Sequence, residues 1–249
     1  MNSPYGISSI WLQGDAIIKT VALTLLLMSI SSWLVIVLRT WGLLHLRKPN
    51  RALTDFWHSQ SFAAGLHILG NDRSDNPYRH LAEEGQAALD HHQNHKTDLH
   101  GNLPLSDWLT ACLKDSIDHS TDKLQRGLAL LASVGSTAPF VGLFGTVWGI
   151  YHALVSISVN GSASIDKVAG PVGEALIMTA FGLVVAIPAV LGYNAINRGN
   201  RTVSSKLNRF AHQLHAYFLT GAPPASSKAN SRGNSAQIKN ITRKNAQAE

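Results

Sequence analysis

Three long stretches of this chain are almost free of charge, and they limit the possible folds more than any other feature. Residues 20–38 and 127–165 contain no Asp, Glu, Lys or Arg, and residues 168–197 contain one charged side chain, Glu174. A run of about 18 or more mostly apolar residues is typical of a membrane-spanning helix. Charged residues make up 14% of the 249 residues, against about 25% in soluble domains. The pattern argues against an ordinary soluble enzyme.

These stretches predict an all-α, polytopic membrane protein with three transmembrane helices. The 39-residue stretch is too long for one span of about 20 residues, and Asn160-Gly161 indicates a turn within it. The predicted spans are residues 20–38, 127–156 and 168–197. The predicted remaining segments are an N-terminus at 1–19, a helical segment at 39–126, a loop at 157–167, a helix at 198–221 and a disordered basic tail at 222–249.

Basic residues flanking the spans predict the orientation of the chain. Lys19 alone precedes the first span, whereas four basic residues closely follow it. Lys167 is the basic residue of the predicted loop, and four more follow the third span. By the positive-inside rule, the N-terminus and the loop lie outside, while the 39–126 segment and the C-terminus lie in the cytoplasm. These inner cations are Arg39, Arg47, Lys48, Arg51, Arg198, Arg201, Lys206 and Arg209.

Two of the transmembrane helices are expected to extend into the cytoplasm. Asn76-Pro77 and Leu103-Pro104 resemble helix starts, because proline suits the first helical position. After Pro104, apolar residues recur mostly at helical spacing as far as Leu131, which predicts one long helix running into the second span. The same spacing recurs from Val203 to Tyr217 after the third span.

The basic charge and the single cysteine exclude some functions. Residues 222–249 hold five basic residues and one acid, and so contribute +4 of the net charge of +6. The excess is therefore a property of the tail, which permits contact with lipid headgroups and does not indicate nucleic acid. Cys112 is the one cysteine, so no intrachain disulfide can form. We expect it to be a small buried apolar residue.

Glu174 is the residue most indicative of function. A carboxylate within a span costs several kcal/mol if it is ionised, unless it gains a cation, water or a proton. The apolar stretches offer no Lys or Arg as a partner. One interpretation is an interfacial side chain that reaches outward to water. The favoured interpretation is a proton or cation site that faces a pore or a protein interface.

Small residues in the second span recur in steps of three and four, which places them on one helix face. Such a face allows another helix to approach closely, and packing alone is sufficient reason for it. Thr146 and Thr179 could each bond a carbonyl of their own helix, or could line a polar path with Glu174. Pro139 and Pro188 remove backbone donors, so local bending is expected. The predicted packing positions are Gly135, Ala138, Gly142, Gly145 and Gly149, together with the two prolines.

Enzymatic, metal and cofactor sites are not indicated. His91 and His95 would be one turn apart on a helix, but a third metal ligand is missing, so a solvated face is the expected role. The phosphate-binding motif of P-loop ATPases does not occur. His152 and Ser156 are also one turn apart, but no acid inside their span could orient the histidine as a protease requires. An interfacial role is expected for His152, and no cofactor is expected.

Two motifs on adjacent spans resemble a known family. Residues 138–150 read APFVGLFGTVWGI, and residues 171–194 read PVGEALIMTAFGLVVAIPAVLGYN. Both are similar to the MotA/TolQ/ExbB proton-channel family, specifically its ExbB and TolQ branch. The WLQGDAIIK segment before the first span is more similar to ExbB. Met178 and Phe181 are bulkier than the residues that relatives often have there.

The resemblance implies a bacterial inner-membrane motor driven by the proton gradient. It implies a homo-oligomeric ring, expected to be pentameric, around the spans of an ExbD-like dimer. Proton flow would act through a TonB-like protein to energise import of siderophore iron and cobalamin across the outer membrane. Glu174 would be the family's membrane glutamate, and Thr146 and Thr179 its pore-facing hydroxyls. The outer side would then be the periplasm.

Three alternatives remain open at this point. A TolQ-like protein would work with TolR and TolA in envelope constriction. A flagellar MotA-like stator fits less well, because that branch has four spans. A passive scaffold without conduction is the rival from another class, and the unpaired Glu174 argues against it.

Overall fold

A computed structural model of the chain describes residues 15–46, 49–70, 76–94, 103–160 and 165–222. Within these ranges the side chains of residues 45, 46, 49–51, 156, 157, 159, 160, 165–171 and 174 are not described. Residues 1–14 of the predicted N-terminus, residues 223–249 of the predicted tail, His95 and residues 161–164 of the predicted loop lie outside the described residues. The predicted loop at 157–167 is too long, because one helix continues to Asn160 and the next begins at Ile165.

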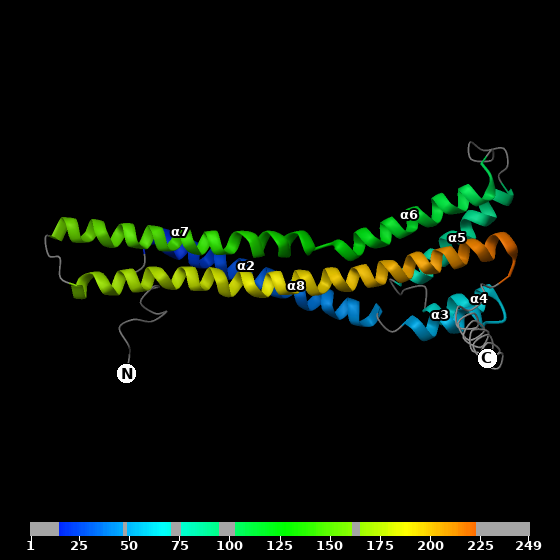
Figure 1. The fold of residues 1–249 in the computed structure, drawn as a ribbon, viewed down its shortest axis with the longest axis horizontal. Helices are drawn as coiled ribbons and strands as arrows, with labels where there is room; N and C mark the ends of the chain where they lie inside the picture. Colours follow the sequence, from blue (N-terminus) through cyan, green and yellow to red (C-terminus); the bar gives the residue numbers. More distant parts are fainter. Residues whose placement is uncertain (1–14, 47–48, 71–75, 95–102, 161–164, 223–249) are drawn as a thin grey trace, which may run out of the picture. The chain divides into compact units, whose positions relative to one another are not determined.

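All regular structure in the described residues is helical (Figure 1). Three stretches are long and apolar enough to cross a membrane, namely Ala16–Leu44, Leu105–Val155 and Ala175–Thr220. The predicted fold class, an all-α chain with three spans, is therefore confirmed. The helices are α2 (Ala16–Leu46), α3 (Pro49–Trp57), α4 (Phe62–Leu69), α5 (Pro77–Asn94), α6 (Leu105–Gln125), α7 (Leu128–Asn160) and α8 (Ile165–Thr220).

The chain divides into two compact units. Unit 1 consists of Met1–Lys48 and Thr121–Val203, and unit 2 consists of Pro49–Ser120 and Ser204–Glu249. Each unit has its own cluster of buried apolar side chains. Helix α8 is continuous from Ile165 to Thr220 and contributes residues to both clusters.

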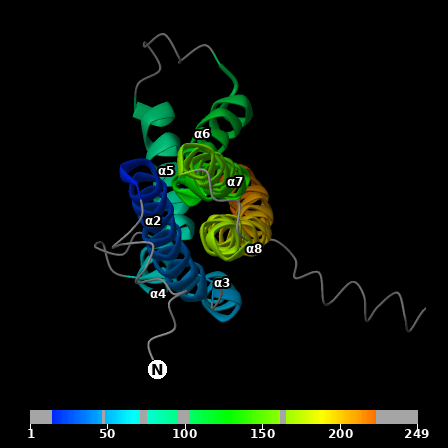
Figure 2. The same ribbon diagram turned by 90° about the vertical axis from the view of Figure 1, so that its left-hand side faces the viewer.

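Unit 1 is a three-helix arrangement in which α2, α7 and the first part of α8 run side by side (Figures 1 and 2). Gly149 contacts Ala175, and Gly135 contacts Val190, so α7 and α8 are antiparallel. Gly192 and Gly199 of α8 contact Ile36 and Leu43 of α2 in the same sequence order, so those two helices are parallel. The buried core includes Val21, Leu25, Leu131, Val134, Ala138, Met178, Val185, Ala189 and Ile196.

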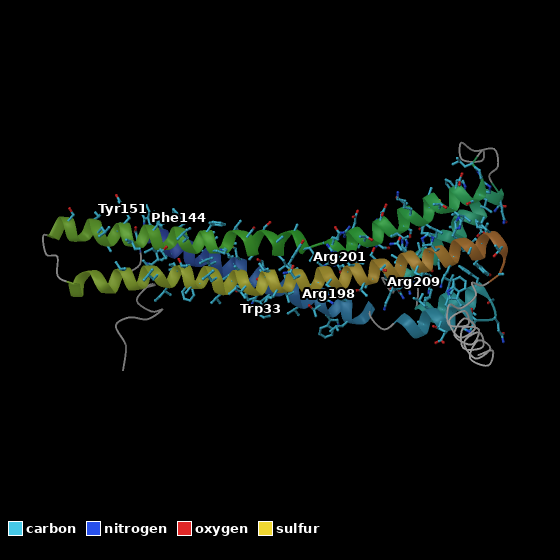
Figure 3. The ribbon with its side chains drawn as sticks, in the orientation of Figure 1. Trp33, Phe144, Tyr151, Arg198, Arg201 and Arg209 are labelled. Atoms are coloured by element: carbon cyan, nitrogen blue, oxygen red, sulfur yellow. The ribbon has the colours of Figure 1, made fainter. Side chains whose placement is uncertain are left out.

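Large apolar side chains also cover the outside of unit 1. Phe140 is 70% exposed and Val184 is 65% exposed. Figure 3 marks Trp33 on α2 with Phe144 and Tyr151 on α7, all more than half exposed. Lipid or protein must cover such a surface, because soluble monomers rarely expose large contiguous apolar patches. The exposed faces therefore agree with a multi-pass membrane protein.

The predicted continuous helix into the second span is wrong at one point. Helix α6 ends at Gln125 and α7 begins at Leu128, with Arg126 and Gly127 in a turn between them. Gly127 has a φ of +83°, in the left-handed region that glycine enters readily. A glycine in this conformation is a common end to a helix. The apolar spacing of Leu124, Leu128 and Leu131 continues across the turn, so periodicity did not reveal it.

Unit 2 has an aromatic core. The Phe210 ring of α8 lies 5.4 Å from Phe56, 5.9 Å from Trp57 and 6.1 Å from Tyr78, edge-on in each case. Aromatic pairs in such geometry contribute about 0.5–1.5 kcal/mol beyond their buried area. The buried apolar residues Leu81, Leu113, Leu207 and Leu214 complete this core.

The start of α5 agrees with the sequence. Asn76 precedes the helix and Pro77 is its first residue. The Asn76 Oδ1 atom accepts a hydrogen bond from the Tyr78 backbone N–H at 3.1 Å. This contact satisfies one of the backbone donors that every helix start leaves unpaired.

A first prediction concerns the glycine contact between α7 and α8. A Cβ atom at Gly142 would lie 2.6 Å from the Met178 carbonyl oxygen and 3.0 Å from the Gly182 Cα. Since both are backbone atoms, Gly142→Ala should force the helices apart and cost about 1–3 kcal/mol. Gly42→Ala is the matched control, because no atom lies within 4 Å of its Cβ position. The thermal unfolding midpoint in one detergent should fall for Gly142→Ala only, and equal midpoints would contradict this packing.

A second prediction concerns Tyr78 in unit 2. Its hydroxyl is buried and has no hydrogen-bond partner among the described residues. Burial raises the pKa of Tyr78 from 10.0 to about 12. The unfolded chain therefore loses this proton at a lower pH than the folded chain, so the stability of the fold falls as pH rises above about 10. The slope is about 1.4 kcal/mol per pH unit.

Tyr78→Phe should abolish this part of the pH dependence and should not lower stability at pH 7, because the hydroxyl makes no bond to lose. Chemical unfolding of both proteins at pH 8 and pH 11 measures the difference. An equal fall in stability between pH 8 and pH 11 for wild type and variant would show that Tyr78 does not cause the pH dependence.

Candidate functional site

Two threonine hydroxyls meet inside unit 1. The Thr179 hydroxyl of α8 donates to the Thr146 hydroxyl of α7 at 3.4 Å. Thr146 is buried, and its own hydroxyl donates to the Leu143 carbonyl at 2.7 Å. The first interpretation from the sequence therefore applies to Thr146, because its hydroxyl bonds a carbonyl of its own helix. Its hydroxyl also accepts from α8, and a polar path that includes Glu174 stays a prediction.

The small residues of α7 determine how closely α8 approaches this pair. A Cβ at Gly145 would lie 3.0 Å from the Met178 Cβ, and one at Gly149 would lie 2.7 Å from the Ala175 Cβ. A Cβ at Gly182 would lie 2.7 Å from the Ala138 carbonyl oxygen. These contacts leave no room for a larger side chain. They place Thr146 and Thr179 within hydrogen-bond reach of one another.

The Gly145 and Gly149 face also receives α2. The Val21 side chain would lie 3.1 Å from a Gly145 Cβ, and Ile18 would lie 3.9 Å from a Gly149 Cβ. Gly135 belongs to the same row, and a Cβ at Gly135 would lie 2.6 Å from the Val190 Cγ2. The whole predicted row of small residues therefore lies against neighbouring helices.

Glu174 lies in the first part of α8, directly before Ala175, the residue that contacts Gly149. Its side chain is not among those described. Five residues separate it from Thr179, a rise of about 7.5 Å along a helix. The backbone thus brings the glutamate position within two turns of the threonine pair.

The two prolines lie within helices and do not interrupt them. Pro139 lies inside α7 next to the buried Ala138. Pro188 lies inside α8 next to the buried Ala189. Each proline removes one backbone donor from its own helix. Both side chains are partly buried, and both helices continue through them.

A second polar group joins α2 to α7 near the same seam. Asp15 precedes α2, and its carboxylate accepts from the Ala16 N–H at 2.8 Å and from the Trp148 indole N–H at 3.4 Å. The His152 Nε2 atom lies 3.9 Å from the same carboxylate. The sequence reasoning missed Asp15 and Trp148. An acid directly before an apolar run is a helix-start signal that could have drawn attention to Asp15.

The approach of Asp15 to His152 bears on whether His152 and Ser156 could act as a protease pair. An acid does approach His152, from α2 rather than from its own span, but 3.9 Å is longer than a hydrogen bond. The Asp15 carboxylate already accepts two N–H groups. The Ser156 side chain is outside those described.

Beyond the threonine pair the seam is apolar. Between Gly182 and Ala189 on α8, and between Gly135 and Gly142 on α7, the buried residues among those described are apolar. The buried positions of α7 and α8 in this stretch therefore provide no polar side chain for a proton path, whereas α2 contributes the buried Ser32 to unit 1.

Histidines and the cysteine form no metal centre in the described part of the chain, which holds no group of three His, Cys, Asp or Glu suited to a metal. The His91 ring lies 5.8 Å from Trp108. Cys112 is partly exposed rather than buried as expected. Burial and the nearby Glu84 and Asp115 carboxylates raise the pKa of its thiol, which makes it a poor nucleophile.

Comparison with known proteins agrees with this geometry. Residues 86–209 match the MotA/TolQ/ExbB proton channel family. The biopolymer transport protein ExbB of Xanthomonas campestris pv. campestris (strain B100) is 42% identical over 84% of this chain and 85% of that protein. The chain belongs to the MotA/TolQ/ExbB family. Because this is a family of proton channel components, the protein is not an enzyme.

Further relatives lie in both parts of the branch. The ExbB protein of Neisseria meningitidis serogroup A is 42% identical over 83% of this chain and 94% of that protein. The Tol-Pal system protein TolQ of Pseudomonas aeruginosa is 30% identical over 82% of this chain and 88% of that protein. Higher identity at similar coverage favours the ExbB part of the family.

A third prediction concerns the contribution of the threonine pair to stability. Thr179→Val removes one long hydrogen bond between neutral groups, so it should cost no more than about 1 kcal/mol. Thr146→Val should cost more, because Thr146 is buried and serves two partners. Thermal midpoints in detergent measure both, with Thr179→Ser as the control that keeps the hydroxyl. A larger loss for Thr179→Val than for Thr146→Val would contradict this arrangement.

Proposed function

We propose that this protein is the ExbB-like subunit of an inner-membrane motor that the proton-motive force drives, and that it energises TonB-dependent import across the outer membrane. Siderophore iron and cobalamin are the expected cargoes. The observation that carries the proposal is the 42% identity to ExbB proteins over more than four fifths of the chain. A second observation supports it, because Glu174 lies on α8 five positions before Thr179, whose hydroxyl bonds that of Thr146.

Glu174, Thr146 and Thr179 are the proposed proton pathway. A potential of 100 mV does about 2.3 kcal/mol of work on each elementary charge that crosses the membrane. A carboxyl group that is neutral at a dry interface and ionised in water can couple this work to movement. Glu174 takes and releases the proton in this scheme, and the two hydroxyls orient the water or side chain that exchanges it.

The chain needs partners to complete this path. The apolar seam beyond Thr146 and Thr179 supports a proton route that continues outside the single chain. We propose that an ExbD-like subunit supplies the missing carboxylate at the centre of a homo-oligomeric ring, with a pentamer as the expected form. The exposed apolar faces of α2, α7 and α8 support contacts with further copies, a TonB-like protein and membrane lipid.

The proposed orientation places Asp15 and the α7–α8 connection in the periplasm, and unit 2 with the C-terminus in the cytoplasm. Arg198, Arg201 and Arg209 lie along α8 with exposed side chains, as Figure 3 marks. Arg39 near the end of α2 adds to the same side. The positive-inside rule supports this assignment.

A TolQ-like role in envelope constriction is the second candidate. It rests on TolQ proteins that are 30% and 27% identical over 82% and 90% of this chain. The protein partners separate the two functions, because the ExbB-like role requires ExbD-like and TonB-like proteins, and the TolQ-like role requires TolR and TolA.

A fourth prediction tests the proton site. Glu174→Gln keeps the size and polarity of the side chain but cannot release a proton. We expect gradient-dependent uptake of a siderophore to fall by about tenfold or more, because removing a group that acts as proton donor and acceptor typically costs about 100-fold or more. Radiolabelled iron uptake in cells that carry the variant as the sole copy measures this.

Affinity purification of the tagged chain provides the control for that experiment. ExbD-like and TonB-like proteins should be recovered with both wild type and Glu174→Gln, which would show that the variant assembles. Recovery of TolR and TolA instead would move the function to envelope constriction. Full uptake by an assembled Glu174→Gln protein would rule out the proposed proton role.

A further inference from the structure

The break between α6 and α7 leaves backbone carbonyls that a continuous helix would have paired. In an uninterrupted helix the carbonyls of Lys123 and Leu124 accept from the N–H groups of residues 127 and 128. The helix ends at Gln125, and the Gly127 backbone is in the left-handed region, with a φ of +83°. Carbonyls at such a helix end require other donors.

Side chains from both other helices of unit 1 reach these two carbonyls. The Arg39 Nη1 of α2 donates to the Lys123 carbonyl at 3.2 Å. The Asn200 Nδ2 of α8 donates to the Leu124 carbonyl at 2.7 Å. Two consecutive carbonyls are thus bonded by two different helices. We name Arg39 and Asn200 together the junction cap.

Glycines allow the helices to come this close. A Cβ at Gly127 would lie 3.0 Å from the Val35 Cγ1 and 3.9 Å from the Arg39 Nε. A Cβ at Gly199, directly before Asn200, would lie 3.0 Å from the Leu43 Cδ1. Helix α2 therefore packs against the turn with its Val35–Arg39 face and against α8 with Leu43.

The polarity of Asn200 is not explained by packing. Asn200 is 6% exposed, and its Oδ1 atom has no hydrogen-bond partner among the described residues. A buried acceptor without a partner costs free energy, and an apolar residue of similar size would avoid that cost. The bond from Nδ2 to Leu124 is the compensating contact. Buried polar groups of this kind can specify one arrangement of helices.

The junction cap lies where the chain leaves unit 1. Arg39, Lys123 and Asn200 are each within nine residues of a boundary between the two units, at Lys48, Thr121 and Val203. The cap therefore joins, inside unit 1, all three segments that continue into unit 2. In the proposed orientation this is the cytoplasmic end of the spans.

We infer that Arg39 and Asn200 are positioning residues that hold the three spans in fixed register at the α6–α7 break, so that movement of the spans in the gradient-driven cycle passes into the following segments together. This inference rests on the proposed function for its consequence in transport, but the cap itself is independent of it. Without the cap, the turn at Gly127 would absorb the movement.

Hydrogen exchange of the purified full chain in detergent tests the cap directly. Arg39→Met and Asn200→Asp each remove a donor, and Asn200→Asp also sets a carboxylate against the Leu124 carbonyl. Amide exchange around residues 121–130 should rise by about tenfold in each variant. Arg39→Lys keeps a cationic donor and should largely restore protection. Unchanged exchange in both Arg39→Met and Asn200→Asp would overturn the cap.

Matched controls come from the same regions. Arg198→Met removes an exposed cation from α8. Asn208→Asp removes an exposed donor that bonds only along its own helix, to Ser204 at 3.0 Å. Neither should change exchange around residues 121–130. If exchange around residues 121–130 rose as much in the controls as in the cap variants, the change in charge would explain the effect. That result would overturn the cap.

Uptake measurements test the positioning role. In cells where the variants assemble like wild type, the maximal rate of gradient-dependent uptake should fall by about tenfold for Arg39→Met and Asn200→Asp. The substrate concentration at half-maximal rate should stay unchanged, and Arg39→Lys should retain most activity. Faster exchange with full uptake would overturn the positioning role. Full uptake by Glu174→Gln would instead count against the proposed function, whatever the exchange result.

Discussion

The close approach of α7 and α8 at their glycines is the contact on which the rest of unit 1 depends. In lipid there is no water to drive apolar helices together, so their association relies on short-range packing, which requires small residues. Gly142 and Gly182 face each other with their backbones in direct contact. This spacing brings the Thr146 and Thr179 hydroxyls within reach of one another and excludes larger groups from the seam. The same tight packing leaves the buried α7 and α8 positions beyond the threonine pair to small and apolar residues.

Unit 2 is held together by different forces. Its core consists of aromatic and branched apolar side chains such as Phe210, Tyr78 and Leu214, which water drives together. On α5 the buried Arg79 forms an ion pair at 2.6 Å with the partly exposed Glu83, one turn along the helix. A single helix, α8, thus supplies the small residues that lipid-immersed packing requires and, further along, the large ones that a water-driven core requires.

The three spans, the row of small residues and the start of α5 could be predicted because each depends on residues close together in sequence. Charge-free length, steps of three and four, and an Asn-Pro pair are local signals. The break at Gly127 escaped prediction because Leu124, Leu128 and Leu131 keep helical spacing on both sides of it. Asp15 with Trp148, and Asn200 with Leu124, are separated by 133 and 76 residues. Such pairs exist only once the helices have packed, so Glu174 could be identified as a functional candidate from sequence while its surroundings could not.

Helix α8 also constrains how the protein can change over evolutionary time. It has 56 residues, about 84 Å at 1.5 Å per residue. Its buried positions form one stripe that runs from Ala175 through Ala189 and Ile196 to Leu207 and Leu214. Each inserted or deleted residue would rotate everything beyond it by about 100°. Within unit 1 such a change would turn the buried α8 positions beyond it away from α2 and α7, whereas a change of length in a connection between helices would not.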